Sequence, residues 1–455
     1  MQQPTGSYAR RLGVFDATML VVGGIIGAGI FLNPAVVAQR APTAGLVIGV
    51  WVLGGAVALA GAFCFAELAA LKPVAGGGYV YLRDGLSPIV GFLYGWTELL
   101  VINSGGIAAV AMTFASYGTD LTGAGSGAIA PVAIGAIMAL SVVNLLGIRP
   151  GAAVQNVLTV LKLAALAALI LAGLFWPVSS TPALPSAAPA PPAPPAPSAS
   201  GLLTAIGTAL IPVLFAYGGW QSTNFVAGEL KEPRRDLPRA LILGVVLVVV
   251  AYVLANIVYV RSLGVSGLAA STAPASDVMR RALGTVGARF IAVGIAISTF
   301  GFLNLAILAA PRVYQTMAAD GVFFGRAARL HERFRVPWAA LLIQGGWAIL
   351  LIATKTYGQL LDYVVFGDWI FFGLVGVTLF VYRRRGDTAS PDGAPAFRTP
   401  GYPWIPGFFV AAAAFAVVST VVSNPRNAAL GAVIIAAGIP AYLFWKQRGP
   451  RPSPP

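Results

Sequence analysis

Long apolar runs without charged residues recur along the whole chain, and short polar stretches separate them. A helix needs about 20 apolar residues to cross the hydrocarbon core of a bilayer. The strict alternation of apolar and polar residues that is typical of membrane-spanning strands is not seen. The pattern therefore predicts an all-α integral membrane protein. It predicts twelve spans, at residues 14–39, 43–71, 87–117, 127–146, 153–175, 201–228, 240–260, 288–311, 337–354, 360–382, 402–424 and 427–445.

Composition excludes an ordinary soluble enzyme. Of the 455 residues, 58% are hydrophobic and only 10% are charged, whereas a soluble domain is about 25% charged. The single His, His331, and the single Cys, Cys64, leave little material for a metal site, a catalytic base or a nucleophile. We therefore expect no enzymatic activity, no cofactor and no bound metal.

The net charge of +14 is explained by where the positive residues fall. Most Lys and Arg residues lie in loops on the same side of the membrane as the N-terminus, and positively charged loops face the cytoplasm. We expect a multi-pass protein of the cytoplasmic membrane, with both termini in the cytoplasm and no binding of nucleic acid. Residues 1–12 are short and polar, and the apolar run after them is too long for a signal peptide. The Ala/Pro-rich stretch 177–200 cannot pack a core and should form an extended external loop.

Two predicted spans contain clusters of glycine near their middle, at residues 23–31 and 215–220. Each glycine lowers helix stability by about 1 kcal/mol relative to alanine, so both helices should be interrupted there. Unpaired backbone is very costly in lipid, so such a break must line a polar cavity. A matching pair of breaks is typical of a transporter binding site. The alternative is that these glycines only allow close helix packing.

At these residues the chain resembles the amino acid permeases of the amino acid–polyamine–organocation superfamily, and most of all their L-type amino acid transporter branch. The motifs are GGIIGAGIF at 23–31, FAELAALKPVAGGGYVYLRDGLSPIVGFLYGWTELLV at 65–101 and FAYGGWQSTNFVAGELKEPRRDLPRA at 215–240. The resemblance implies a LeuT-type fold in which helices 1 and 6 are discontinuous. It divides the chain into a first inverted repeat (1–176), the external loop (177–200), a second inverted repeat (201–385) and two further spans with a short tail (386–455).

The resemblance also implies which residues hold the substrate. Backbone N–H groups in the first break would bind the carboxylate, and carbonyl groups in both breaks would bind the amino group. The carboxylate then falls to Gly27, Ala28 and Gly29, and the amino group to Ile25, Phe215 and Gly218. The expected gate and pocket residues are Phe215, Tyr217, Trp220 and Asn304, with Gly105, Gly106 and Phe366 as further candidates for specificity. Because no unpaired acid clearly faces the pocket from the sixth span, we expect a neutral amino acid.

Lys162 stands alone in a strongly apolar span. An intramembrane charge indicates function by default, although a lysine can also extend its ammonium to the membrane surface. In the resembling family a lysine here reaches the first and eighth spans and takes the place of a sodium ion. The resemblance therefore implies sodium-independent transport.

Four acidic residues have open roles. Glu67 and Glu98 could relay protons or pair with polar groups between helices, and Asp368 remains unassigned. Glu229 could pair with loop arginines in an inner gate or remain solvated.

The function that these features favour is secondary transport of amino acids by alternating access. The alternative is a proton-coupled symporter of amino acids, amines or polyamines in the same superfamily, because the sequence does not decide between exchange and proton symport. A channel or sensor on the same fold is the weaker alternative. Animal members of the resembling branch join a glycoprotein through a Cys after the third span, and residues 118–126 contain none. We expect no disulfide-linked subunit, and a monomer or weak homodimer.

Overall fold

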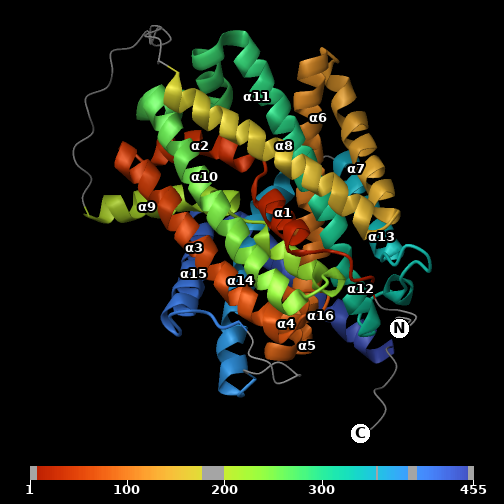
Figure 1. The fold of residues 1–455 in the computed structure, drawn as a ribbon. Coiled ribbons are helices and arrows are strands. Elements are labelled where there is room, and N and C mark those ends of the chain that lie inside the picture. The colour runs from red at the N-terminus through yellow and green to blue at the C-terminus, as the bar shows by residue number, and fades with distance from the viewer. Residues whose placement is uncertain (1–7, 177–198, 355–356, 388–396, 449–455) are drawn as a thin grey trace.

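The computed structural model describes residues 8–176, 199–354, 357–387 and 397–448 (Figure 1). The part that it describes is built from helices, and its only strand-like pairing is one bridge between Leu12 and Leu230. The predicted loop 177–200 lies outside the described residues except for its last two positions, which begin α9. The prediction of an all-α protein is confirmed for the described residues.

The α-helices differ widely in length, from the 8 residues of α4 to the 38 residues of α10. In chain order they are α1 (Val14–Ile25), α2 (Gly29–Arg40), α3 (Ala44–Leu71), α4 (Gly78–Gly85), α5 (Pro88–Thr97), α6 (Asn103–Thr122), α7 (Ile129–Leu145), α8 (Ile148–Phe175), α9 (Ala199–Ala216), α10 (Pro233–Ala270), α11 (Pro274–Ala309), α12 (Pro311–Ala319), α13 (Trp338–Ala353), α14 (Tyr357–Arg384), α15 (Trp404–Ser423) and α16 (Pro425–Arg448). Short helical turns of other pitch join some of them, including the π-helical turn η1 (Glu98–Ile102) and the 3-10 helix η3 (Trp220–Glu229).

Ten helical segments of the described residues are long and apolar enough to cross a membrane. They match the predicted spans except for 201–228 and 337–354. The first exception is interrupted, because α9 ends at Ala216 and the chain continues as a 3-10 helix from Trp220. The second is only 16 residues long in α13, which is shorter than the usual span. Within the described residues, length and composition therefore identify ten of the twelve predicted spans.

Helices that are far apart in the sequence pack side by side. The helix α3 lies along α10, and α8 lies along α11 (Figure 1). Between these pairs lies α1, which contacts α8, α10 and α11. Large apolar side chains on the outer helices are exposed, among them Phe175 and Val422, as expected for surfaces that face lipid.

The chain is not helical at either glycine cluster. At the first, α1 ends at Ile25 and α2 begins at Gly29. At the second, Gly219 follows the end of α9 with a φ of 108°, a conformation that favours glycine. A Cβ atom at Gly219 would overlap the carbonyl group of Gly24, so the two clusters meet backbone to backbone.

We expect Gly219→Ala to destabilise the protein. The positive φ alone costs a residue with a Cβ atom about 1–2 kcal/mol, and the contact with Gly24 adds to this. Thermal unfolding of the purified protein in detergent should show a clear fall in Tm. Gly106→Ala is the control, because a Cβ there meets nothing within 4 Å. Equal Tm values for the two variants would contradict the close approach.

Candidate functional site

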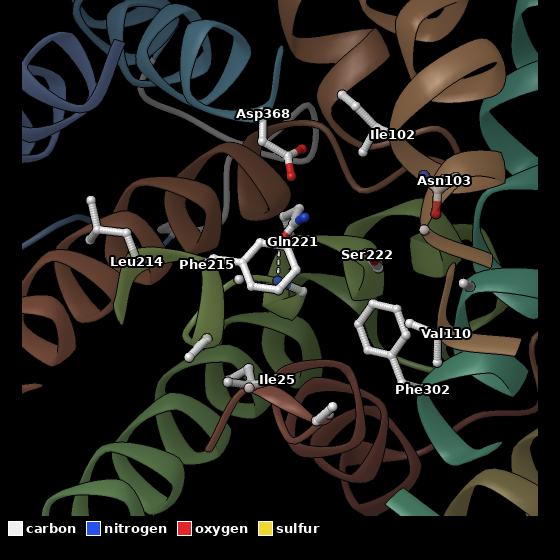
Figure 2. Close-up of a pocket in the computed structure, with 18 of the residues that line it drawn as sticks. Ile25, Ile102, Asn103, Val110, Leu214, Phe215, Gln221, Ser222, Phe302 and Asp368 are labelled. Atoms are coloured by element: carbon white, nitrogen blue, oxygen red, sulfur yellow. Dashed lines mark hydrogen bonds between the residues drawn. The ribbon is translucent and has the colours of Figure 1, made fainter. Parts of the chain in front are cut away.

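A cavity of about 140 Å³ lies where the two breaks face α6, α11 and α14 (Figure 2). An engineered protein cavity of about 150 Å³ holds benzene, so this space suits a small molecule. Apolar side chains supply most of the wall. The residues proposed from sequence that line it are Ile25, Gly27, Ala28, Gly29, Gly106, Phe215 and Gly218.

The first break offers hydrogen-bond donors to the cavity. Because α2 begins at Gly29, its first N–H groups have no partner within the helix, and a helix N-terminus favours an anion. A Cβ at Gly29 would lie 3.0 Å from the Cβ of Ala216, so glycine also lets α9 pack closely here. A free carboxylate could bind at such a helix start, but the N–H of Gly27 already donates to the Ile25 oxygen at 2.9 Å. The assignment of the carboxylate to Gly27, Ala28 and Gly29 stays a prediction.

The carbonyl groups proposed for the substrate amino group are partly occupied. The oxygen of Ile25 accepts hydrogen bonds from the Tyr252 hydroxyl at 3.0 Å and from the Gly27 N–H at 2.9 Å. The oxygen of Phe215 accepts one from the Gly218 N–H at 3.1 Å. An ammonium group binding to Ile25 would therefore displace an existing donor, and these assignments remain predictions.

Lys162 is fully buried on α8 and does not extend to a membrane surface. Its ammonium group donates to the carbonyl oxygens of Gly23 at 3.0 Å, Ile26 at 2.7 Å and Ser298 at 3.1 Å. It thereby joins the end of α1 to α11, the first and eighth predicted spans. The Ser298 hydroxyl donates to Ile26 as well, at 3.0 Å. These donors satisfy backbone groups that the break leaves without helical partners.

Three residues expected at the gate or pocket, Tyr217, Trp220 and Asn304, are not among the residues that line this cavity. Tyr217 packs edge-on against Trp51. Trp220 packs against Phe65. Asn304 bonds to the side chains of Asn144 and Gln155, at 3.0 and 2.9 Å. Each is at most 2% exposed, because its side chain packs between helices and does not face the cavity. Of the other specificity candidates, Gly105 and Phe366 are also buried outside the lining.

Sequence reasoning missed the polar side chains of the wall. These are Asn103, Gln221, Ser222 and Asp368. In Figure 2 the carboxylate of Asp368 points into the cavity. The Gln221 side chain accepts a hydrogen bond from the Gly219 N–H at 2.8 Å and so holds the second break. A charged residue inside an apolar run is a signal of function, and it could have drawn attention to Asp368. Asp368 has no role assigned from sequence because no motif includes it.

Glu229 is not solvated. Its carboxylate receives two hydrogen bonds of 3.0 Å from the Arg312 guanidinium, and both residues are 1% exposed. The backbone carbonyl of Glu229 also accepts from the N–H groups of Arg11 and Leu12, which ties the segment before α1 to the segment after η3. This agrees with the pairing expected of an inner gate, although the partner lies on α12.

Glu67 has a comparable bidentate pairing. Its oxygens accept from the Arg383 guanidinium at 2.8 and 2.7 Å, and from the Thr399 N–H at 2.7 Å. These contacts connect α3 with α14 and the segment before α15. Of the two roles open for Glu67, they favour pairing between helices.

The family model and the relatives that match this chain all describe amino acid permeases, transporters or exchangers. The family model described as amino acid permease matches residues 12–445. The chain is 30% identical to the serine/threonine exchanger SteT of Bacillus subtilis (strain 168), over 96% of this chain and 97% of that protein. It is also 30% identical to the mouse b(0,+)-type amino acid transporter 1, over 98% and 92%. The human large neutral amino acids transporter small subunit 2 is 30% identical, over 96% and 81%.

We expect Arg312→Ala to lower the free energy of unfolding by about 3–5 kcal/mol, because it leaves the buried Glu229 carboxylate without a partner. Arg235→Ala is a matched control, since its pair with Glu232 has side chains about 60% exposed and should contribute at most about 1 kcal/mol. Unfolding titrations in mixed detergent micelles would compare them. Similar losses of unfolding free energy in both variants would show that the buried pair contributes no more to stability than the exposed pair.

Proposed function

Since this chain belongs to the amino acid permease family, we propose that it is a secondary transporter that exchanges neutral amino acids across the cytoplasmic membrane by alternating access, without sodium. The observation that carries the proposal is the cavity between the two interrupted segments, which exposes the start of α2 beside the end of α9. A zwitterion offers a carboxylate for the N–H groups at the start of α2 and an ammonium group for the carbonyl groups of the two breaks.

The proposed fold is a LeuT-type bundle of twelve spans with interrupted first and sixth helices. Residues 1–176 and 201–385 would be inverted repeats, and residues 386–455 would add two spans. In support, α9 and α13 are apolar helices at the places of the two spans that length alone does not identify. We place both termini in the cytoplasm on the strength of the loop charges.

We propose that the substrate carboxylate binds at Gly27, Ala28 and Gly29, and that its amino group binds carbonyls of Ile25, Phe215 or Gly218. Phe215 is a candidate gate, because it lines the cavity with 45% of its surface exposed. Neutral substrates are supported by the relatives, one named as a serine/threonine exchanger and another as a large neutral amino acids transporter subunit.

We propose that the chain works without a disulfide-linked subunit, as a monomer or a weak homodimer. Its single cysteine, Cys64, is buried in α3. One relative is named as a small subunit, which implies a partner chain for that protein. A partner bound to this chain without a disulfide would not contradict the proposal. Electrophoresis of the native membrane extract, with and without reductant, tests this point.

The proposed exchange can be measured in proteoliposomes loaded with a mixture of unlabelled amino acids. External labelled amino acid should enter faster than into empty vesicles, because the carrier returns loaded. Replacing sodium by choline should leave the rate unchanged. Uptake that does not saturate and ignores the internal amino acids would indicate a channel instead.

We expect Lys162→Met to slow exchange at least about tenfold while the protein still inserts and remains monodisperse. Each buried carbonyl that loses its donor costs about 1–3 kcal/mol, and the end of α1 would lose its link to α11. Lys231→Met is the control, because Lys231 is exposed. Unchanged exchange in Lys162→Met, or a new dependence on lithium but not sodium, would contradict the proposed role.

A further inference from the structure

The cavity wall opposite the first break carries one carboxyl group that no described residue neutralises. Asp368 lies on α14 and lines the cavity. Its Oδ1 atom is shut off from solvent and has no hydrogen-bond partner among the described residues. Figure 2 shows both carboxylate oxygens directed into the cavity, toward Gln221.

The buried cations of the described residues are committed elsewhere. Lys162 is held by carbonyl groups of the first break, and Arg312 by Glu229. Arg383, on the same helix as Asp368, is held by Glu67. The charged group that acts on Asp368 is another acid, Glu98 of η1.

Tyrosine hydroxyl groups are the other titratable groups near this pair. Tyr94 of α5 interacts electrostatically with both carboxylates, and Tyr314 of α12 with Glu98. Asn103 donates to the second oxygen of Glu98. Burying an acceptor without a donor is costly, and more so for a charged one. The local surroundings therefore leave Asp368 in need of a donor that the cavity's occupant can supply.

The position of Asp368 determines which part of an occupant it would meet. In Figure 2, Asp368 and Asn103 lie on one side of the cavity, and Ile25 of the first break lies on the other. An amino acid held by its carboxylate at the break would direct its side chain toward Asp368. The cavity of about 140 Å³ lies between them.

We propose that Asp368 is a specificity-determining residue, which accepts a hydrogen bond from a hydroxyl, amide or ammonium group at the end of the substrate side chain. This inference rests on the proposed function and redefines its substrate class as amino acids with a polar side chain, neutral or cationic. A site built to bond a substrate hydroxyl rejects the analogue that lacks it strongly, by up to about 10⁴–10⁵. An apolar substrate would leave the Asp368 carboxylate buried and unpaired.

The test compares substrates of matched shape. Threonine against valine differs by one hydroxyl, and ornithine against norvaline differs by one ammonium group. Binding is read as the shift in Tm of the purified protein with each amino acid, and exchange as counterflow in proteoliposomes. The wild type should prefer the polar member of at least one pair by about tenfold or more. Asp368→Leu should abolish or reverse that preference, and Asp120→Asn, at an exposed position on α6, should keep it.

Asp368→Asn separates the two kinds of polar substrate. It keeps an acceptor oxygen and removes the charge, so it should retain threonine and lose ornithine. Retention of the wild-type ratios in Asp368→Leu would overturn the inference while leaving amino acid exchange intact. The inference would also be overturned if Asp368→Leu changed the response to a pH gradient equally for all substrates, because Asp368 would then be a proton site. If the wild type exchanges no amino acid at all, the proposed function fails first.

Discussion

The end of α1 inside the bundle imposes the central constraint on this structure. A helix that stops at membrane depth leaves carbonyl and N–H groups without partners, and lipid cannot supply them. The protein supplies donors from three other helices: Lys162 from α8, Tyr252 from α10 and Ser298 from α11. The break is thus stable because the surrounding helices are arranged around it. The residues at the start of α2 line the cavity instead.

The close approach of the two breaks also constrains helix packing. The two breaks approach so closely that neither Gly24 nor Gly219 leaves space for a side chain. Charged pairs then join the elements beyond the breaks. Glu229 and Arg312 connect η3 with α12, and Glu67 and Arg383 connect α3 with α14. Buried pairs of this kind contribute little net stability compared with apolar packing, but they tolerate the loss of one partner badly. They therefore hold particular helices in register.

Much of the architecture could be predicted from the sequence because the bilayer allows few solutions. Runs of about 20 apolar residues mark helices, and adjacent glycines mark the places where helices stop. The residues at the first break can be placed on the cavity for this reason, and Lys162 stands out as an isolated charge. In the described residues, no helix of full spanning length matches the predicted spans 201–228 and 337–354.

The sequence by itself determined the helical membrane class, the positions of the two glycine clusters and the isolated lysine, because hydropathy and glycine content act locally along the chain. Only the tertiary structure decided which side chains meet the cavity. Helix rotation and packing turn Tyr217, Trp220 and Asn304 away from it, and bring Asp368, Asn103 and Gln221 to its wall. A side chain's orientation depends on all the helices that pack around it, and no single segment of the chain encodes that arrangement.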